Sequence, residues 1–422
     1  MAQKEYLKKV ILKKQINTVD FLHFLSVKQK KEMLELAYAL RGKRVVHVNA
    51  TEKGGGVAEI LKSLIPYLRS LGLQSDWYCF NPMLDKKFFY ITNKIHNALQ
   101  GSLIKIKYEE WTEYERVSKS VAMELDTIDY DILVIHDPQP LLAGAYCKLN
   151  KKKIFFSHID TSEASDMAWK RIFSIANSYD RIVFSNRNFV HNHFAAGKIK
   201  VFTPAIDPLS PKQQIVSKKE ARFYLKKYSG IAQHVPLIAQ ISRFDEWKNP
   251  MGVIKAFNII KNTYQKALLM LVGFKEASDN PLAQKCYESI MAVAGNSPEI
   301  YIFFNPKGKN ILEFTTMAQN AADIVVQNSI KEGFGLTVTE AMWKGHPVIG
   351  GPASGIRKQI KNGKNGFIAE NPDELAQKMI FLLSHPKKKK KMGNEAKKTV
   401  QKKFLFPRLV LDHLKLYKSC LK

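Results

Sequence analysis

The segment RVVHVNATEKGGGVAEILKSLIPYLRSLGLQSDWYCF, residues 44–80, contains a complete strand–helix–strand unit. Residues 44–50 and 75–80 are short apolar runs rich in β-branched and aromatic side chains, which is typical of strands. Between them, apolar side chains recur at the i, i+3, i+4 and i+7 spacing of a half-buried helix in residues 57–71. Two strands joined by a helix form a right-handed unit with parallel strands, so this segment predicts an α/β fold.

The same alternation continues along the chain in two series. The first series of strand-like runs lies at 44–50, 75–80, 131–136, 152–158, 180–185 and 200–205. The second series lies at 236–243, 266–273, 299–304, 323–329 and 346–351. Between them, PAIDPLSPK (204–212) carries three prolines, which favour an extended linker because proline fixes φ and restricts the residue before it.

We therefore predict two Rossmann-like, doubly wound domains that face each other across a cleft. The N-terminal domain is expected to span residues 1–208. The C-terminal domain is expected to span 209–405. A final helix at 406–422 has an amphipathic pattern and is expected to pack back on the N-terminal domain. Open α/β sheets bind ligands at the carboxyl ends of their strands, so functional side chains are expected there.

Length and composition agree with a globular protein of this size. At roughly 150 residues per domain, 422 residues suit two or three domains. Hydrophobic residues make up 45% and charged residues 25%, which argues against a mainly disordered chain. No stretch approaches the ~20 apolar residues of a membrane-spanning helix. The four cysteines are widely scattered, which favours a reducing compartment, and we expect a cytoplasmic protein.

The chain is strongly basic, with 66 Lys and Arg against 38 Asp and Glu, a net charge of +28. Much of the excess is terminal, since residues 1–42 contribute +5 and residues 386–422 contribute +11. The run Lys387–Lys391 is interpreted as a solvated helix start, although contact with an acidic membrane surface stays open. No aromatic side chains for base stacking interleave with the lysines of this tail, so nucleic-acid binding is not favoured.

A triple glycine, Gly54-Gly55-Gly56, follows the strand at 44–50 and opens the helix at Val57. Glycines allow a ligand to approach the backbone amides, and a helix N-terminus attracts anions, so this is a candidate phosphate site. The spacing matches neither the dinucleotide fingerprint nor the P-loop. A flexible turn is the alternative interpretation.

Histidine and aspartate end two strands of the first domain. His136 and Asp137 follow one strand, and His158 and Asp160 follow another. Polar side chains at these positions are expected to line the cleft, although a single histidine is more often structural. The spacing typical of a zinc site is missing from the sequence.

In the second domain, Arg243 and Lys248 lie just after the strand at 236–243, in SRFDEWK. Arginine can chelate two oxygens and lysine acts as a point charge, so the two could hold a diphosphate leaving group. A surface pair on a basic protein is the alternative.

Glu332 and Glu340 bracket EGFGLTVTE, in which Gly333 and Gly335 expose amides before a helix. If all eight steps were helical, the carboxylates would lie roughly 12 Å apart. Retaining glycosidases need about 5 Å and inverting ones up to about 9.5 Å. The pair is therefore interpreted as two hydrogen-bond acceptors along an elongated ligand, for a sugar hydroxyl and a ribose. Two ordinary glutamates at a helix start are the alternative.

Together these motifs resemble the retaining nucleotide-sugar glycosyltransferases of the GT-B fold, and within them the trehalose glycosyltransferring synthase group. The resembling stretches are HVNATEKGGGVAEIL (47–61), HNALQG (96–101), HDPQP (136–140), HID (158–160), PAIDPLS (204–210), SRFDEWK (242–248) and EGFGLTVTEAMWKGHPVIG (332–350).

The resemblance implies that glucose is moved from a nucleoside diphosphate glucose to free glucose, giving α,α-trehalose with retention. It implies that the N-terminal domain serves the acceptor side and that the C-terminal domain binds the nucleotide-sugar donor. It also implies catalytic roles for Glu332, Arg243, Lys248 and His158. Donor-binding residues by similarity are Gly55, Gly56, Gly333, Phe334, Gly335, Leu336 and Glu340, the last on the ribose. Acceptor-binding residues by similarity are Asp137, Asp160 and His136. The resemblance implies no tightly bound cofactor, no metal site of the protein and Mg²⁺ only as a stimulating ion.

Three stretches depart from the pattern of this group: residues 185–194, 303–310 and 350–356. They leave the donor base open among uracil, adenine and guanine, so both UDP-glucose and ADP-glucose are candidates, and they leave the acceptor open. The alternatives are a GT-B transferase with another sugar or lipid acceptor, a trehalose phosphorylase, and, least favoured, a nucleic-acid-binding protein. The sequence also leaves a homodimer open.

Overall fold

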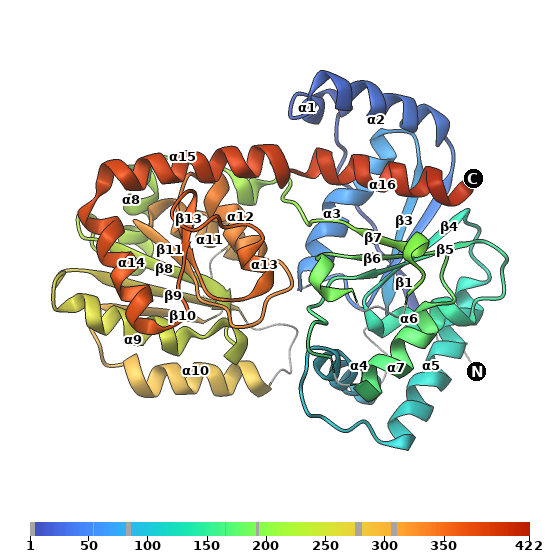
Figure 1. Ribbon diagram of the computed structural model, residues 1–422, viewed down its shortest axis with the longest axis horizontal. Coiled ribbons are helices and arrows are strands. Elements are labelled where there is room, and N and C mark those ends of the chain that lie inside the picture. The colour runs from blue at the N-terminus through green and yellow to red at the C-terminus, as the bar shows by residue number, and fades with distance from the viewer. Residues whose placement is uncertain are drawn as a thin grey trace. The chain divides into compact units, whose positions relative to one another are not determined.

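The computed structural model describes residues 5–53, 55–81, 86–164, 166–190, 194–274, 281–304 and 310–422. The chain divides into two compact units (Figure 1). Unit 1 comprises Met1–Pro204 together with Phe406–Lys422, and unit 2 comprises Ala205–Leu405. Each unit contains one largely or wholly parallel sheet with helices, which confirms the predicted α/β class.

Unit 1 contains a seven-stranded sheet in the order β1-β3-β2-β4-β5-β6-β7. Its strands are β1 Leu7–Lys9, β2 Arg44–Asn49, β3 Gln74–Phe80, β4 Ile132–His136, β5 Lys152–Ser157, β6 Arg181–Phe184 and β7 Ile199–Val201. The edge strand β1 pairs antiparallel with β3, and the other pairings are parallel. All five residues of β4 are buried, as expected for a parallel strand covered on both faces.

The helices of unit 1 form two groups. The first group is α2 Val27–Ala39, α3 Gly55–Ser70 and α16 Phe406–Leu421, in which α16 packs on the other two (Figure 1). The second group is α4 Lys86–Leu99, α5 Tyr108–Leu125, α6 Pro138–Tyr146 and α7 Asp166–Ala176. The short elements are α1 Thr18–Leu22, η1 Arg187–Phe189 and η2 Ala196–Lys198. The last helix of the chain is therefore part of the first unit.

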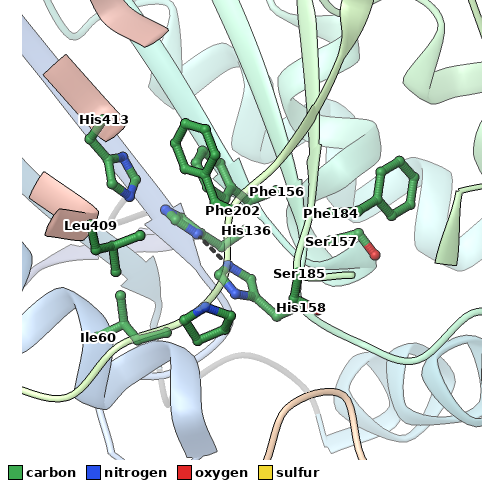
Figure 2. A pocket seen from close by; sticks show the side chains of 11 residues that line it. Ile60, His136, Phe156, Ser157, His158, Phe184, Ser185, Phe202, Leu409 and His413 are labelled. Atoms are coloured by element: carbon green, nitrogen blue, oxygen red, sulfur yellow. Dashed lines mark hydrogen bonds between the residues drawn. The ribbon is translucent and has the colours of Figure 1, made fainter. Parts of the chain in front are cut away.

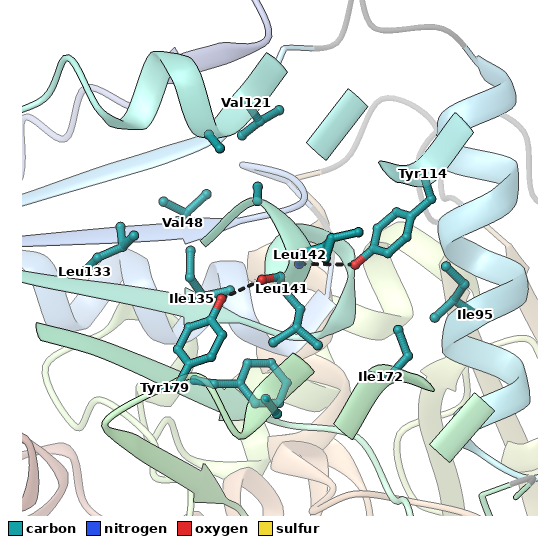
Figure 3. Packing of buried hydrophobic residues seen from close by; sticks show 14 of the residues in the cluster. Val48, Ile95, Tyr114, Val121, Leu133, Ile135, Leu141, Leu142, Ile172 and Tyr179 are labelled. Carbon is teal, nitrogen blue, oxygen red and sulfur yellow. Dashed lines mark hydrogen bonds between the residues drawn. The ribbon is translucent and has the colours of Figure 1, made fainter. Parts of the chain in front are cut away.

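Two buried tyrosines, Tyr114 on α5 and Tyr179 in the turn before β6, hold helix α6 (Figure 3). The Tyr179 hydroxyl donates to the Leu141 carbonyl over 2.5 Å, and the Tyr114 hydroxyl donates to the Pro138 carbonyl over 2.6 Å. A Cβ at Gly144 would lie 2.6 Å from Ile135 Cγ1 and even closer to the Tyr179 hydroxyl. At position 144, helix and sheet thus approach more closely than any larger residue allows.

Unit 2 contains a six-stranded parallel sheet in the order β10-β9-β8-β11-β12-β13. Its strands are β8 Leu237–Arg243, β9 Leu268–Phe274, β10 Ile300–Phe304, β11 Ile324–Gln327, β12 Val348–Gly350 and β13 Gly366–Ile368. Its α-helices are α8 Lys218–Ser229, α9 Pro250–Lys261, α10 Pro281–Ala294, α11 Ile311–Ala321, α12 Leu336–Trp343, α13 Ser354–Arg357, α14 Pro372–Ser384 and α15 Pro386–Lys403. Two 3₁₀ turns, η3 Pro211–Gln213 and η4 Glu246–Lys248, complete it.

The lysine run lies in the first turns of α15, directly after Pro386. Four of its five lysines are exposed, and Lys389 reaches Asp323 at 3.5 Å. This agrees with a solvated helix start. Within the described part of the chain, no helix combines the length and apolar character that crossing a bilayer requires.

Candidate functional site

The predicted functional residues lie in two groups, one in each unit, and most follow the carboxyl ends of parallel strands. In unit 1 the group follows β4 and β5, and Figure 2 shows the side chains around His136 and His158. In unit 2 it follows β8 and β11.

Asp137 has a strained backbone. It follows β4 and precedes α6 with φ 64° and ψ 171°, a combination that residues with a Cβ rarely adopt. Two bonds hold it: its N–H donates to the Phe156 carbonyl over 2.8 Å, and its Oδ1 accepts the His158 N–H over 2.7 Å. Such strain is commonly retained where a side chain must be aimed at a ligand.

The carboxyl group of Asp137 is also unusual in its acidity. Burial raises its pKa from an ordinary 3.8 to about 7, against the opposing effect of the bond from the His158 N–H. The carboxyl therefore exchanges its proton near neutral pH. A carboxylate with such a pKa is suited to accept a hydrogen bond from a neutral hydroxyl.

His158 is the first member of a chain of hydrogen bonds through the interior of unit 1. Its Nε2 lies 2.9 Å from His136 Nδ1, and His136 Nε2 lies 3.0 Å from His47 Nδ1. His47 Nε2 lies 3.3 Å from the Tyr417 hydroxyl, which lies 3.0 Å from His413 Nδ1. We call these five residues the histidine chain.

All four imidazoles of the histidine chain are held neutral by burial. The pKa of His47 falls to about 3 and that of His158 to about 4, while those of His136 and His413 fall well below the ordinary value. Mutual repulsion among the protonated rings adds to the effect at His136 and His413. Sequence reasoning identified His136 and His158 but missed the other three, which come from β2 and α16.

A small cavity lies beside these rings, offering about 20 Å³ to the centre of a water-sized sphere. His136, His158, His413 and Phe156 contribute to its wall (Figure 2). This volume is enough for about one water molecule, so it is not the sugar site itself.

The remaining predicted residues of unit 1 lie in turns and at a helix start. Asp160 Oδ1 accepts bonds from the Ser162 N–H over 3.0 Å and the Ser162 hydroxyl over 2.6 Å. Gly55 and Gly56 form the first residues of α3. Gly54 lies outside the described residues.

In unit 2, two predicted catalytic side chains form an ion pair. Lys248 Nζ lies 2.6 Å from Glu332 Oε2, and the two side chains are only 10% and 17% exposed. Lys248 ends η4, whose N-cap is Asp245. Arg243, the last residue of β8, keeps 46% of its side chain exposed and lies 3.4 Å from Asp245 Oδ2. Two cations therefore lie near the carboxyl end of β8.

The loop between Glu332 and Leu336 is held by Gln359, whose Nε2 donates to the Phe334 carbonyl over 2.5 Å and to the Gly335 carbonyl over 3.3 Å. Gly335 is the N-cap of α12 at φ 84°, a conformation that favours glycine. The Phe334 ring packs on Phe404 with centroids 5.6 Å apart. The first amides of α12 lie at the positive end of its dipole. Because the helix begins only at Leu336, the helical spacing considered for Glu332 and Glu340 does not apply.

Glu340 is buried on α12, with 3% exposure, and is charged. Its Oε1 lies 2.7 Å from Lys212 Nζ, and Gln319 Nε2 donates to Oε2 over 3.4 Å. Burial alone would raise the pKa of Glu340, but Lys212 and Lys344 hold it below the ordinary value. Burial in turn lowers the pKa of Lys344 to about 8. Sequence reasoning missed both lysines: nothing in the sequence links Lys212, in η3, to α12, whereas Lys344 lies four residues after Glu340 at the C-terminal end of α12.

Neither group resembles a metal centre. Over the described ranges, no cluster of three or more His, Cys, Asp and Glu side chains has a geometry that could hold a metal ion. The histidine chain agrees with this finding, since its rings bond in series and do not converge on one point.

Two family models match the chain. One, described as "Trehalose synthase, N-terminal domain", matches residues 47–191, and the other, "Glycosyl transferases group 1", matches residues 222–399. The trehalose synthase of Pyrococcus horikoshii is 34% identical over 401 residues, covering 95% of each chain. That of Rubrobacter xylanophilus is 36% identical over 395 residues, covering 92% of this chain and 94% of its own.

The chain belongs to the trehalose synthase family. It is therefore an enzyme, a glycosyltransferase of trehalose synthesis that uses a nucleotide-sugar donor, as the resemblance predicted. A trehalose phosphorylase of Pleurotus pulmonarius is more distant, at 25% identity, and the match covers 52% of its length.

Solved structures confirm the GT-B fold of this trehalose synthase. Trehalose-6-phosphate synthase OtsA has a TM-score of 0.71 at 16% identity, covering 90% of this chain and 99% of its own. Sucrose-phosphate synthase of Thermosynechococcus elongatus has a TM-score of 0.69 at 16% identity, covering 89% and 98%. Anabaena HepE, solved with UDP and glucose, has a TM-score of 0.65 at 16% identity, covering 89% and 99%.

Proposed function

We propose that this trehalose synthase transfers a glucosyl group from UDP-glucose or ADP-glucose to free glucose and retains the α configuration. Unit 2 would bind the donor and unit 1 would orient the acceptor. The observation that carries the proposal is the Lys248–Glu332 pair, which joins a cation for the diphosphate to a carboxylate for the donor sugar over 2.6 Å.

The cations at the end of β8 are suited to bind the diphosphate. Arg243 can contact two phosphate oxygens at once, and the Lys248 ammonium carries a compact charge. Both would stabilise the negative charge that develops as the bond from the glucosyl C1 to the diphosphate oxygen breaks. Preplaced cations lower the barrier because they need little rearrangement when the charge appears.

Glu332 and the α12 N-terminus are suited to hold the rest of the donor. Glu332, with the amides of Gly333 to Leu336, would bind the sugar hydroxyls, since a carboxylate accepts and backbone amides donate. Glu340, kept ionised by its lysine neighbours, would accept bonds from the ribose hydroxyls. Gly55 and Gly56 would add amides of unit 1 to the diphosphate. No resident cofactor is needed, and Mg²⁺ would act only with the diphosphate.

Retention would follow from attack on the face of C1 that the diphosphate leaves. The acceptor hydroxyl oxygen forms the new bond to C1, and its proton passes to the departing phosphate oxygen. Asp137 and Asp160 would orient the acceptor hydroxyls, and His158 would contact the sugar near C1. Both ring nitrogens of His136 bond within the histidine chain, and the residue is only 1% exposed. We therefore propose that His136 supports His158 and does not bind the acceptor.

We place the reaction in the cytoplasm, because the four cysteines are free. The test is to incubate the enzyme with a panel of nucleoside diphosphate glucoses and glucose, and to analyse products by NMR. The expected product is a non-reducing disaccharide with two α-anomeric protons. Donor hydrolysis without disaccharide would indicate another acceptor, and release of glucose 1-phosphate from trehalose and phosphate would indicate a phosphorylase.

A further inference from the structure

We propose that His47, His136, Tyr417 and His413 act as positioning residues that fix the ring orientation and the tautomer of His158. The inference rests on the proposed function in one respect, the contact of His158 with the donor sugar. Its other premises come from unit 1 alone. It assigns a role in the reaction to the last helix of the chain.

The hydrogen bonds from His158 to His47 are continuous. Three consecutive rings are bonded nitrogen to nitrogen at 2.9 and 3.0 Å, and their centroids lie 5.2 and 5.3 Å apart with interplanar angles of 23° and 19°. The bonds link β5, β4 and β2 in the order in which these strands lie across the sheet. Each ring is thus fixed by the next, and rotation of His158 would break its bond to His136.

The protons of the histidine chain are ordered along it. A neutral imidazole carries one N–H and one acceptor nitrogen, and a bond between two nitrogens needs one of each. Neighbouring rings in the chain must therefore point their protons in the same direction. Either every proton points toward α16, which leaves His158 Nδ1 as an acceptor, or every proton points toward His158, which makes its Nδ1 a donor.

Tyr417 transmits this order to the far end of the chain. Its hydroxyl has one proton, so it can accept from His47 and donate to His413, or accept from His413 and donate to His47. If both rings donated to it, its own proton would stay unbonded in a buried site, which costs about 1–3 kcal/mol. The tautomer of His413 and that of His158 are therefore coupled through the hydroxyl of Tyr417.

The surroundings keep the chain in the neutral state that this coupling needs. Phe156 stacks on His413 with centroids 5.1 Å apart and 10° between the planes, and it also stacks on His158. Phe202 meets the edge of His413. Arg408, on the same helix, repels a proton on His413, as do His47 and His158 when they are charged. Protonation of a ring would break the order, and this environment disfavours it.

The consequence for the reaction is that the hydrogen-bonding character of His158 Nδ1 can change only if every proton of the histidine chain reverses together. A sugar hydroxyl near that nitrogen would then be held in one orientation. A histidine whose tautomer is not fixed spends part of its time with the wrong nitrogen protonated, and orientation by a buried partner is known to matter greatly for catalytic histidines.

The test uses the full-length enzyme and the variant Tyr417→Phe, which removes one hydroxyl and keeps the ring. We expect kcat to fall at least about tenfold, in the range typical when a group that orients a reacting ligand is lost, with the KM for the nucleotide sugar changed less than twofold. Tyr130→Phe is the matched control, because Tyr130 is equally buried in unit 1 and lies outside the histidine chain. It should leave kcat and KM near wild-type values.

A second pair of variants keeps the test valid if Tyr417→Phe folds poorly. His413→Phe removes the last member of the chain, whereas His413→Asn places an amide near the position of Nδ1 and should restore most of kcat. The ¹⁵N resonances of His158 give a readout independent of activity. The wild type should show one tautomer, and Tyr417→Phe should show a mixture.

The outcomes separate this inference from the proposed function. A Tyr417→Phe enzyme with kcat within twofold of wild type and an unchanged His158 spectrum would overturn the inference. If the wild type makes no trehalose but the His158 spectrum responds to Tyr417→Phe, the proposed acceptor fails while the positioning role stands. An equal loss of kcat in Tyr130→Phe would show that the loss in Tyr417→Phe comes from a general change in packing. That result would also overturn the inference.

Discussion

Replacement of Asp137 by asparagine should make unit 1 more stable at alkaline pH while it impairs the enzyme. The carboxyl group is buried, and burial raises its pKa from 3.8 to about 7. Asparagine keeps the Oδ1 that accepts the His158 N–H and tolerates positive φ better than most residues. It cannot ionise, so it removes the cost of burying a charge.

The size of the effect follows from the shift in pKa. A group with a raised pKa in the folded state contributes stability that is present below its unfolded pKa and is lost as pH rises through the folded value. For Asp137 the loss spans about pH 4 to 7. Each step of one in pH corresponds to 1.36 kcal/mol in the free energy of unfolding. The two steps from pH 5 to pH 7 therefore amount to about 3 kcal/mol. The variant should therefore gain about 3 kcal/mol relative to wild type between pH 5 and pH 8.

The assay is urea unfolding of both proteins at pH 5, 6, 7 and 8, with hydrogen exchange of β4 amides to follow unit 1 itself. Comparing the two proteins at each pH cancels the titration of every other group. A stability difference that stays constant within about 0.5 kcal/mol, or one that changes in the opposite direction, would refute the reasoning. In the wild type, transfer should increase as pH rises through about 7, and the variant should lose this dependence together with most of its activity.

Three further predictions concern the rest of the molecule. Glu332→Gln and Arg243→Ala should each reduce transfer at least about 100-fold, by steady-state kinetics, without a change in the circular dichroism spectrum; near-normal turnover in either would remove that residue from the site. Lys212→Met should destabilise unit 2 by about 2–3 kcal/mol in denaturant, because it leaves the buried Glu340 carboxylate with a poorer partner; an unchanged midpoint would contradict this. Gly144→Ala should cost about 1–3 kcal/mol, because its methyl group would overlap a buried tyrosine hydroxyl; wild-type thermal stability would show that α6 can shift freely.

Much of the fold could be predicted because its signals are local. Strand-like runs, helical spacing and a proline-rich linker are properties of adjacent residues, and the structure confirms two α/β sheets. The run at 44–50 became β2, and the helical pattern at 57–71 became α3. The sequence placed the joint after residue 208, whereas the compact units divide after Pro204. The contacts that decide such a boundary are made by segments distant in the chain.

The site could be predicted only where motifs carry it. Lys248 and Glu332 stand out by their neighbours in the sequence, and the structure places them in contact. Lys212 contacts Glu340 from the linker, and no local pattern marks it. The strain at Asp137 was equally invisible, since it depends on bonds to Phe156 and His158.

The histidine chain shows the same limit most clearly. His47 lies inside a strand, where the sequence pattern predicts only a buried side chain. Tyr417 and His413 lie one turn apart on the last helix, a spacing that the apolar face of any amphipathic helix can accommodate. His47 and Tyr417 are 370 residues apart in the sequence. The packing of α16 within unit 1 brings their side chains within hydrogen-bond distance. A pattern of neighbouring residues cannot predict a contact between segments so distant in the sequence.

The central claim is that this chain makes α,α-trehalose from a nucleotide sugar and glucose with retention. It is tested most directly with donor labelled with ¹³C at C1 of its glucose and with unlabelled glucose as acceptor, followed by NMR during turnover. We predict that the label moves into a disaccharide in which both anomeric carbons are α and no reducing end is present. A labelled carbon in the β configuration, or label found only in free glucose, would contradict the claim.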